Sequence, residues 1–530
     1  MATTSPVSCS ASLAVNDALP SLLTEAEVQL CERLAEVEVA NAATPHWWAA
    51  NLNPDAGWLP GSDSPNPLST TARLVAWCRT VAHVLRCAVY KGYRIYFLCP
   101  PALRRRLRRR LRRRLATEGH GCEIIRTWVD GRTWESPGAP YRDTYWQNFV
   151  DNAAERCDNL VILAEAEGDE KHVAECFRHA NDDSPICVPY EFFLTPWTIL
   201  KAAWLAVFAS CRVPAGLSVG KRDVTGHIRR HLRSSRNGGE RFSNYCQYFS
   251  AVQIFRRLQP ARFWYLWENA VWEKLNLLAR YQHSPKTRMV GYQHSSMILS
   301  LLRYYPGTAA EEHALHPDRI VTTGQMPIRI LEQFGHYPDG LFAVGGSLRY
   351  RHLFDKDFPE VPNGTPNTIG IAGNIDAETT VAMLASLESV FELDPSVSVV
   401  VKFHPNCGYE EIRGLLPKFN WDRTRVVTEL TDFWEAIDIL CYAESTICFE
   451  AAMLGLPIVC LDTGQGRKAD NMFYSEHYKW IIDRGAAILE VMREVGAMSK
   501  ADRRSQIDAA REAVKAYFTP PEAATLAGFY

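Results

Sequence analysis

Short apolar runs alternate with stretches of helical periodicity along most of the chain. Before residue 350 the runs predict strands at 93–98, 123–129, 160–163, 263–267, 288–292, 319–323 and 341–344. Apolar positions at helical spacing predict helices at 22–42, 71–90, 145–156, 196–210 (a buried core helix) and 270–279. Strands that alternate with helices favour a parallel sheet covered by helices.

The same alternation starts again after a polar stretch at 351–367 that contains three prolines. Strands are expected at 368–372, 397–403, 425–427, 437–442 and 458–461, and a last helix at 505–518. The pattern therefore predicts an α/β protein with two Rossmann-like domains that face each other across a cleft. The expected units are a partly disordered N-terminal extension (1–66), a first domain (67–350), a linker (351–367), a second domain (368–500) and a C-terminal helix packing back on the first domain (501–530).

One segment has an unusual charge pattern. Nine arginines lie between Arg104 and Arg114, and Leu103, Leu107, Leu111 and Leu115 recur at every fourth position. This spacing predicts a narrow amphipathic helix. Its basic face is either solvated or contacts an anionic partner, and we favour an anionic membrane surface.

Composition narrows the class of protein only slightly. Hydrophobic residues make up 47% of the 530 positions, and the formal net charge is −2, so no overall field recruits nucleic acid. The 15 cysteines are scattered without a Cys-x-x-Cys pair, which favours reduced thiols and a cytoplasmic protein. No signal peptide or membrane-spanning run is apparent, so any membrane contact is expected to be peripheral, on the inner face of the cytoplasmic membrane.

The candidate chemistry of the second half lies where strands end. One strand ends in Lys402-Phe403-His404-Pro405, and another runs into Glu444-Ser445-Thr446 at the start of a helix. Ligands of open α/β sheets bind outside the carboxyl ends of the strands, and a helix start offers free N–H groups to a phosphate. We expect a nucleotide-phosphate pocket here, lined also by Gly373 and Asn374. The alternative for His404 is a core histidine.

In the first half, Glu268 follows an aromatic strand, and His294 follows the next one. Glu268 is our candidate catalytic carboxylate, as general base or nucleophile, and His294 would orient it or bind the substrate. An alternative role for Glu268 is to stabilise the helix that follows. Glu165, Glu167 and Asp169, after another strand, are rival carboxylates.

These residues carry a resemblance. Three stretches of the second half resemble the nucleotide-sugar half of GT-B glycosyltransferases. They are Lys402-Phe403-His404-Pro405, residues 444–446 and the run Phe449-Glu450-Ala451-Ala452-x-x-Gly455-x-Pro457. These stretches are most similar to bacterial sialyltransferases and Kdo transferases. Residues 260–350, with Tyr265 to Glu273, 291–295 and 345–350, resemble bacterial surface-carbohydrate biosynthesis proteins.

The resemblance implies a GT-B-like fold in which 67–350 holds the acceptor and catalytic groups and 368–500 binds the nucleotide sugar. His404, beside Lys402 and Pro405, would contact the phosphate of CMP. Ser445 and Thr446, between Glu444 and Glu450, would bind phosphate or ribose. No Asp-x-Asp cluster is placed to hold a metal, and no cofactor is expected. The acidic-acidic-Gly base motif of sialyltransferases is matched only imperfectly by Glu165-Ala166-Glu167-Gly168, so Glu167 remains a candidate beside Glu268.

The sequence therefore predicts a glycosyltransferase of surface polysaccharide or lipopolysaccharide biosynthesis. It would transfer Kdo or a related nonulosonic acid from a CMP-sugar to a glycan or lipid-linked acceptor. A UDP-sugar or CDP-polyol transferase of the same fold and a non-catalytic binding module are the alternatives. Nucleic-acid binding through the arginines lacks a recognition motif and is not expected.

Overall fold

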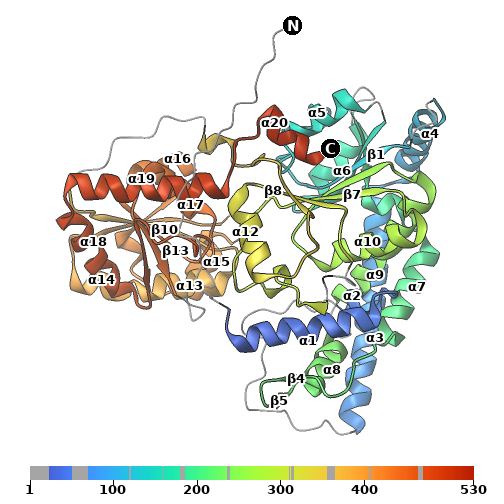
Figure 1. Ribbon diagram of the computed structural model, residues 1–530, viewed down its shortest axis with the longest axis horizontal. Helices are drawn as coiled ribbons and strands as arrows, with labels where there is room; N and C mark the ends of the chain where they lie inside the picture. Colours follow the sequence, from blue (N-terminus) through green and yellow to red (C-terminus); the bar gives the residue numbers. More distant parts are fainter. Residues whose placement is uncertain are drawn as a thin grey trace.

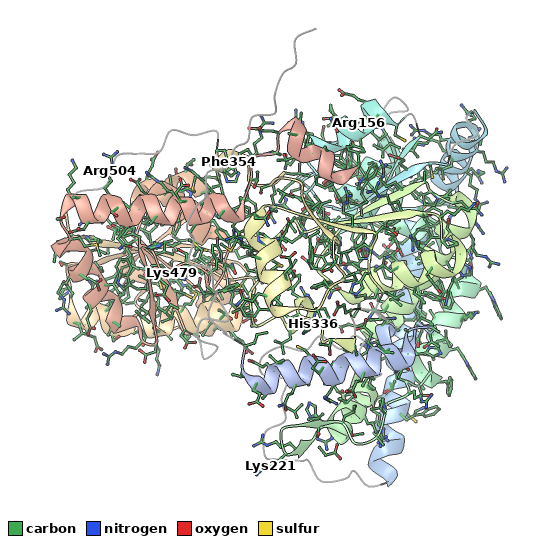
Figure 2. All side chains as sticks on the ribbon, in the orientation of Figure 1. Arg156, Lys221, His336, Phe354, Lys479 and Arg504 are labelled. Carbon is green, nitrogen blue, oxygen red and sulfur yellow. The ribbon has the colours of Figure 1, made fainter. Side chains whose placement is uncertain are left out.

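The computed structural model describes residues 23–50, 70–117, 121–157, 159–179, 185–235, 239–309, 311, 315–354, 364–404, 407–462 and 470–530. Two α/β domains lie side by side, the second on the left in Figure 1 and the first on the right. Side chains fill both interiors: Lys479, inside the second domain in Figure 2, forms an ion pair with the buried Asp470 carboxylate.

The first sheet has seven parallel strands in the order β3-β2-β1-β6-β7-β8-β9. They are β1 (Glu123–Val129), β2 (Leu160–Ala166), β3 (Ile186–Pro189), β6 (Arg262–Leu266), β7 (Arg288–Tyr292), β8 (Arg319–Thr322) and β9 (Phe342–Val344). The strands are buried on both faces, which explains why they occur as continuous apolar runs in the sequence.

Helices on both faces and an N-terminal layer complete this domain. They are α1 (Glu25–Asn41), α2 (His46–Ala49), α3 (Thr70–Leu98), α4 (Pro101–Thr117), α5 (Phe149–Arg156), α6 (Glu170–His179), α7 (Pro196–Phe208), α8 (Thr225–Ser234), α9 (Gly239–Leu258), α10 (Val271–His283) and α12 (Gln325–Phe334). A small hairpin, β4 (Ser218–Val219) with β5 (Arg222–Asp223), lies beside α8. Helix α1 begins with the expected capping box, in which Thr24 and Glu27 bond to each other's backbone N–H groups.

The second sheet has six parallel strands in the order β12-β11-β10-β13-β14-β15. They are β10 (Thr368–Ala372), β11 (Ser398–Lys402), β12 (Thr424–Val427), β13 (Ile439–Tyr442), β14 (Ile458–Leu461) and β15 (Lys479–Ile482). Its helices are α13 (Ala377–Ser386), α14 (Glu388–Leu393), α15 (Tyr409–Leu415), α16 (Leu430–Ala436), α17 (Ile447–Leu454), α18 (Ile488–Ala497) and α19 (Lys500–Tyr517). Both strand orders are those of doubly wound Rossmann-like sheets, so the expected fold class is confirmed.

The C-terminus connects the two domains. Helix α19 packs against α17 of the second domain and α12 of the first. The chain then enters the first domain through α20 (Ala523–Leu526) and the 3-10 turn Ala527–Phe529, in which Phe529 is fully buried. There the indole N–H of Trp264 donates to the Phe529 carbonyl at 3.0 Å. The last residues are therefore part of the first domain's core.

One expected strand is wrong. Residues 93–98 alternate in polarity, but they form the last turns of α3. Val84, Lys91 and Leu98 are buried at seven-residue spacing, which is helical, whereas Tyr93 and Tyr96 are both exposed. Lys91 occupies a buried position of the helix, so the inner side of α3 is not a continuous row of apolar residues and the helical pattern was not recognised past residue 90.

The prediction that residues 196–210 form a core helix is half wrong. Helix α7 forms at Pro196–Phe208, but only one side of it is buried. Trp197 and Trp204 are 73% and 63% exposed. An apolar helix is expected to be buried all round, so this outer face requires an explanation.

Candidate active site between the two sheets

Each sheet reverses its strand order at one point. In the first sheet the reversal lies between β1 and β6, and in the second between β10 and β13. In doubly wound folds the ligand binds at the carboxyl ends of the strands next to this point. Glu268 follows β6, and Glu444 to Thr446 follow β13, so the sheet order brings these sequence candidates to the reversal points.

The two edges approach each other at the domain boundary. His352 Nε2, after the first sheet, lies 3.6 Å from Glu450 Oε1 on α17. Arg132, after β1, is close enough to His404 to lower its pKa. Thr446 lies beside the buried Tyr350 hydroxyl. These contacts show that Glu450, His404 and Thr446 of the second domain face the first domain.

On the first domain, Glu268 is flanked by a histidine and an arginine. His294 Nε2 lies 3.7 Å from one carboxylate oxygen, and Arg303 Nη2 lies 3.6 Å from the other. Arg303 also donates from Nε to the Glu268 carbonyl at 3.0 Å. The arrangement holds a partly exposed carboxylate beside one cation.

His294 lies in an aromatic enclosure made by Trp128 and Tyr145, with ring centroids 5.9 and 5.4 Å away. Burial lowers the pKa of His294 to about 4, and the nearby Arg349 guanidinium acts in the same direction. The imidazole is therefore neutral at pH 7. A neutral imidazole can accept a proton or position a neighbouring group.

Hydrogen bonds from nearby side chains hold the backbone around Glu268 in place. Asn269 has a left-handed φ of 54°, and its amide donates to the Arg303 carbonyl at 2.5 Å. The Glu273 carboxyl accepts the N–H groups of Glu268 and Ala270 at 2.8 and 3.0 Å. Burial raises the pKa of Glu273 to about 8. Glu268 is thus held rigidly, as a catalytic carboxylate requires.

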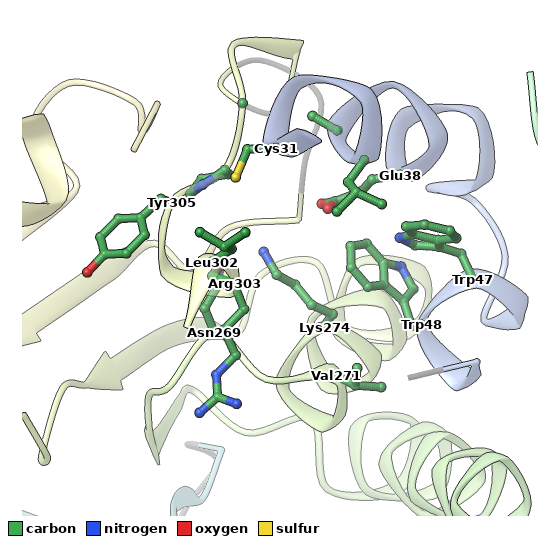
Figure 3. A pocket seen from close by; sticks show the side chains of 14 residues that line it. Cys31, Glu38, Trp47, Trp48, Asn269, Val271, Lys274, Leu302, Arg303 and Tyr305 are labelled. Carbon is green, nitrogen blue, oxygen red and sulfur yellow. The ribbon is translucent and has the colours of Figure 1, made fainter. Parts of the chain in front are cut away.

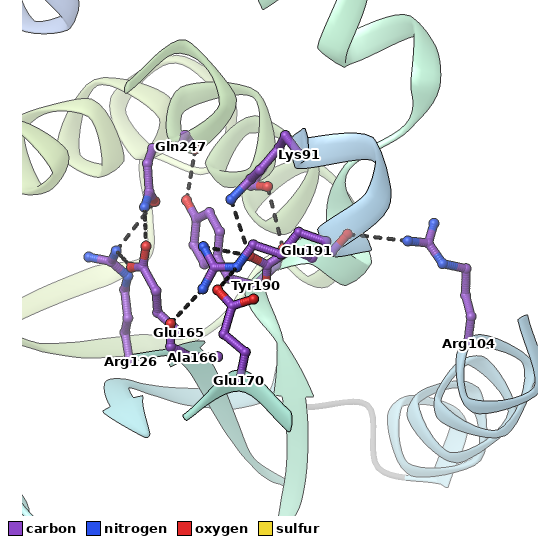
Figure 4. A network of polar contacts seen from close by, with 11 residues as sticks. Lys91, Arg104, Arg126, Glu165, Ala166, Glu170, Tyr190, Glu191 and Gln247 are labelled. Carbon is purple, nitrogen blue, oxygen red and sulfur yellow. Dashed lines mark hydrogen bonds and ion pairs between the residues drawn. The ribbon is translucent and has the colours of Figure 1, made fainter. Parts of the chain in front are cut away.

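Two of the three rival carboxylates have structural roles. Glu165 lies within β2 and accepts hydrogen bonds from Arg126 and Gln247, both at 2.6 Å (Figure 4). Asp169 accepts the N–H groups of Lys171 and His172 at the start of α6. Both are engaged with the protein itself, so neither is free to act on a substrate.

Glu167 differs from these two. Burial raises its pKa, and the Asp130 and Glu165 carboxylates add to the effect, with a smaller contribution from Glu268. Among the described residues, its side chain has no hydrogen bond or ion pair. Glu167 therefore shares the site with Glu268 and His294.

On the second domain, the start of α17 lies at the reversal point. Thr446 is its N-cap residue, yet no side chain accepts a hydrogen bond from the N–H groups of the first turn at the usual cap position. Ser445 Oγ lies 3.5 Å from the Ile447 nitrogen, which is a weak contact. The weakly bonded Ile447 N–H and the helix dipole favour an anion here.

Lys402 and His404 lie at the tip of β11, which β10 separates from β13. Burial lowers the pKa of His404, and the positive charges of Lys402 and Arg132 lower it further. An anion bound beside His404 would favour its protonated form. Pro405 lies outside the described residues.

Gly373 and Asn374 lie at the tip of β10, but the Asn374 side chain is engaged internally. Its amide donates to the Ala443 carbonyl at 3.0 Å and so joins the tips of β10 and β13. Glu444 has a left-handed φ of 52°, and burial raises the pKa of its carboxyl. Asn374 therefore shapes the expected nucleotide edge rather than offering its side chain to a ligand.

The cavity behind Glu268 is not a substrate site. It is lined by residues of α1, α2, α10 and the loop after β7, including Glu38, Trp48 and Lys274 (Figure 3). Its volume is about 80 Å³, far below the roughly 300–1,000 Å³ of small-molecule sites. Trp48 Nε1 and one Glu38 oxygen are buried without a partner among the described residues, so the cavity suits ordered water.

A larger hollow, of about 320 Å³, lies at the domain boundary and is lined by Arg349, His352 and Pro521 among others. The Arg349 guanidinium lies over the rings of Tyr145 and Tyr350, each with a centroid 5.7 Å away. Among the described residues it has no carboxylate partner. Arg349 thus provides an available cation between the His294 enclosure and this hollow.

Sequence reasoning missed several of these groups. Arg303 lies on the 3-10 turn Leu302–Tyr304, and Trp128 and Tyr145 come from β1 and the turn before α5. None of them follows a strand in the way that Glu268 and His294 do. Tyr145 was expected to start a helix, and nothing in that pattern indicated that its ring would lie against His294.

No protein-family model and no curated protein matches the sequence. Among solved structures, the chain is similar to a UDP-GlcNAc 2-epimerase from Neisseria meningitidis bound to UDP-GlcNAc, with 10% identity, a TM-score of 0.40 and coverage of 77% of this chain and 97% of that one. For a glycosyltransferase from Rickettsia africae the values are 11%, 0.39, 76% and 95%. For CalG4, the calicheamicin glycosyltransferase, they are 13%, 0.41, 77% and 97%. Identities and scores are low, so these likenesses assign no reaction to this chain.

Proposed function

We propose that the chain is a glycosyltransferase that takes its sugar from a nucleotide donor. The observation that carries the proposal is the meeting of two sheet reversal points at one interdomain site. One side offers an uncapped helix start with Lys402 and His404. The other offers Glu268 between His294 and Arg303. An anion site opposite a positioned carboxylate suits the departure of a nucleotide and the activation of an acceptor hydroxyl.

On the donor side, the phosphate would lie at the N-terminus of α17, near His404. Negative charge grows on the leaving nucleotide as the sugar–oxygen bond breaks. Preorganised N–H groups and cations stabilise that charge most where water is excluded. Glu450 and Glu444 would lie near the ribose. The ribose hydroxyl groups can donate hydrogen bonds to their carboxylates.

On the acceptor side, Glu268 would act as the general base. It would take the proton of the acceptor hydroxyl as the oxygen attacks the sugar carbon. His294 and Arg303 position its carboxylate, and Glu167 is the second carboxyl group within the site. If the reaction retains configuration, Glu268 would act as the nucleophile instead.

The donor proposed in particular is the CMP-sugar of Kdo or a related nonulosonic acid, and the acceptor is a glycan or lipid-linked glycan of surface polysaccharide biosynthesis. Two features support this choice. A CMP-sugar carries one phosphate, which a single helix start with one lysine and one histidine can hold. A nonulosonic acid carries a carboxylate, and Arg349 is a cation without a carboxylate partner in the described part of the site.

The test is a thermal-shift series with CMP, CDP, UDP and GDP on the wild type, His404→Ala and the exposed control Lys418→Ala. We expect CMP to stabilise the wild type and the control, and His404→Ala to lose most of the shift. A larger shift with UDP or CDP would overturn the CMP donor in favour of a UDP-sugar or CDP-polyol. No shift with any nucleotide would overturn the transferase and leave a non-catalytic binding module.

The base is tested separately with Glu268→Gln. We expect this variant to keep the nucleotide shift but to lose transfer by about 10²–10⁴-fold, the usual contribution of a general base. Donor consumption and product are followed by chromatography with the matching CMP-sugar. Retention of transfer in Glu268→Gln, with loss in Glu167→Gln, would move the base to Glu167.

A further inference from the structure

Helices α3 and α7 expose large apolar side chains on one outer surface. On α7 they are spaced at three or four residues, and so form one stripe along the helix: Trp197, Leu200, Trp204 and Phe208. In the C-terminal half of α3 they are Leu85, Val89, Tyr90, Tyr93 and Tyr96. We call these nine residues the α3–α7 face. Val89, Trp197 and Tyr96 are 75%, 73% and 66% exposed, which is unusual for side chains of this size.

This face is additional to the packing that holds the helices in place. The opposite sides of α3 and α7 pack on α9, where Val84, Ile199, Ala202 and Phe249 belong to one buried cluster. The two helices also pack on each other. The inner sides of both helices are therefore fully packed, and the outer apolar residues are not needed to complete the core.

The arginine-rich helix α4 is fixed beside this face. It follows α3 directly, and Arg104 donates to the carbonyls of Glu191 and Leu194, both at 3.2 Å, just before α7 begins. Arg106 donates to the last carbonyls of α6. Leu103, Leu107 and Leu111 are buried, as the spacing predicted. In Figure 1, α4, α7 and α3 follow the edge of the first domain that points away from the second domain.

Four further arginines of α4 are exposed to solvent. Arg105, Arg108, Arg109 and Arg112 are exposed and, within the described residues, have no ion pair or ring contact. Further, the sequences of α3, α4 and α7 contain no aspartate and no glutamate, although the chain has 60 acidic residues. This edge of the molecule is thus apolar and basic and carries no carboxylate on these helices.

We propose that the α3–α7 face and the exposed arginines of α4 together dock the protein on an anionic lipid surface. Tryptophan and tyrosine suit the headgroup region because one part of each ring is apolar and the other hydrogen-bonds. Arginines beside them would bind lipid phosphates. No helix among the described residues is long and apolar enough to cross a bilayer, so the contact lies in the plane of the surface.

Other occupants fit less well. A second copy of the chain related by twofold symmetry would bring the basic edges of both copies together, without carboxylates on these helices to pair with them. A single-stranded nucleic acid would stack on the aromatic rings but gain little from Leu85, Val89 and Leu200. The proposal does not rest on the proposed glycosyl transfer, since lipid docking requires no nucleotide.

The experiment is vesicle co-sedimentation of the full chain with neutral phosphatidylcholine vesicles and with vesicles that contain phosphatidylglycerol. We expect binding to the anionic vesicles only, weakened by salt. Trp197→Ser combined with Trp204→Ser should lower binding at least tenfold. A triple variant should also bind the anionic vesicles more weakly and lose most of the salt dependence. It combines Arg105→Ser, Arg109→Ser and Arg112→Ser.

Matched controls come from the second domain. Leu393 is 65% exposed, so Leu393→Ser is the apolar control, and Lys418→Ser with Arg425→Ser is the charge control. Neither should change binding, and a melting temperature close to that of the wild type shows that each variant is folded. Absence of binding to anionic vesicles, or equal binding by the tryptophan variant, would overturn the proposal. So would a wild-type dimer that the same variant converts to a monomer, or tighter binding to single-stranded RNA than to vesicles.

Discussion

At the residue scale, the candidate site is built around ionisable groups whose surroundings decide their protonation. Glu268 keeps contact with Arg303, His294 is neutral because it is buried, and Glu273 is protonated at neutral pH because burial raises its pKa to about 8. At neutral pH the His294 imidazole is therefore deprotonated while the nearby Glu273 carboxyl is protonated. Such separation is typical of sites that move protons.

Glu273 gives a pH prediction. Its pKa in the folded chain exceeds the ordinary value of 4.5, so the stabilising contribution is complete below pH 4.5 and is lost as pH rises towards 8. Glu273→Gln keeps an acceptor for both N–H groups and cannot ionise. We expect the free energy of unfolding of the variant to exceed that of the wild type increasingly from pH 5 to pH 8.5, by on the order of 4 kcal/mol at the upper end.

Urea unfolding at both pH values measures this difference. Glu435→Gln, at an exposed position, should show no such trend. His294 affects stability in a lower pH range. Because its pKa in the folded chain is lowered, its contribution to the free energy of unfolding is lost as pH falls from about 6.5 towards 4. A constant difference between Glu273→Gln and wild type across the whole range would contradict the assignment.

At the element scale, α3 shows how long-range charge pairing decides a local structure. Its last turns place Lys91 3.1 Å from the buried Glu191 carboxylate, and Arg94 at 2.8 Å from Glu170. In an isolated peptide, residues 93–98 would favour a strand because they are aromatic and β-branched. The buried pairs are formed only in the helix, so the tertiary contacts override the local preference.

The Lys91–Glu191 pair gives a stability prediction. Lys91→Met leaves the Glu191 carboxylate buried beside Arg94 alone, and removal of one partner of a buried pair costs about 3–5 kcal/mol. Because Arg94 remains 3.5 Å away, we expect the lower end of that range. Replacement of both partners, Lys91→Met with Glu191→Met, should recover a large part of the loss.

Equilibrium urea unfolding of the single and double variants measures these changes. Lys171→Met, at an exposed position on α6, serves as the control and should change the free energy of unfolding by less than about 0.5 kcal/mol. A double variant that is less stable than Lys91→Met would show that the pair is not the source of the effect.

At the scale of the whole molecule, the chain crosses between its two domains twice, once after Phe354 and again after α19. The second crossing ends with Phe529 inside the first domain, against Phe149 with ring centroids 4.5 Å apart. The backbone of Thr519 donates to the Thr323 carbonyl at 2.7 Å and so fixes the crossing at the first sheet's edge. The C-terminal segment is therefore anchored in the first domain while α19 packs on the second.

Phe529→Ala tests this connection. Truncation of a fully buried phenylalanine costs about 3–5 kcal/mol, and here the loss falls on the first domain although the residue is next to last in the chain. Differential scanning calorimetry should show a lower melting temperature for Phe529→Ala, with little change for the exposed control Leu393→Ala. Equal melting temperatures for Phe529→Ala and wild type would contradict the role of the tail.

The sequence by itself determined the α/β class, most strands, and the positions of Glu268, His294, His404 and Thr446 at strand ends. The physical reason is that strands buried on both faces must be continuous apolar runs, and polar residues return where each strand leaves the sheet. These signals are local, so they can be read without knowledge of the fold. The amphipathic helix at the arginines was predictable for the same reason.

Only the tertiary structure decided which of these groups act together. It removed Glu165 and Asp169 from the candidates because Arg126, Gln247 and the start of α6 already occupy them. It added Arg303 and Arg349, and it exposed the outer side of α7. Each of these outcomes depends on contacts between residues far apart in the chain, and a local pattern contains no information about its distant partner.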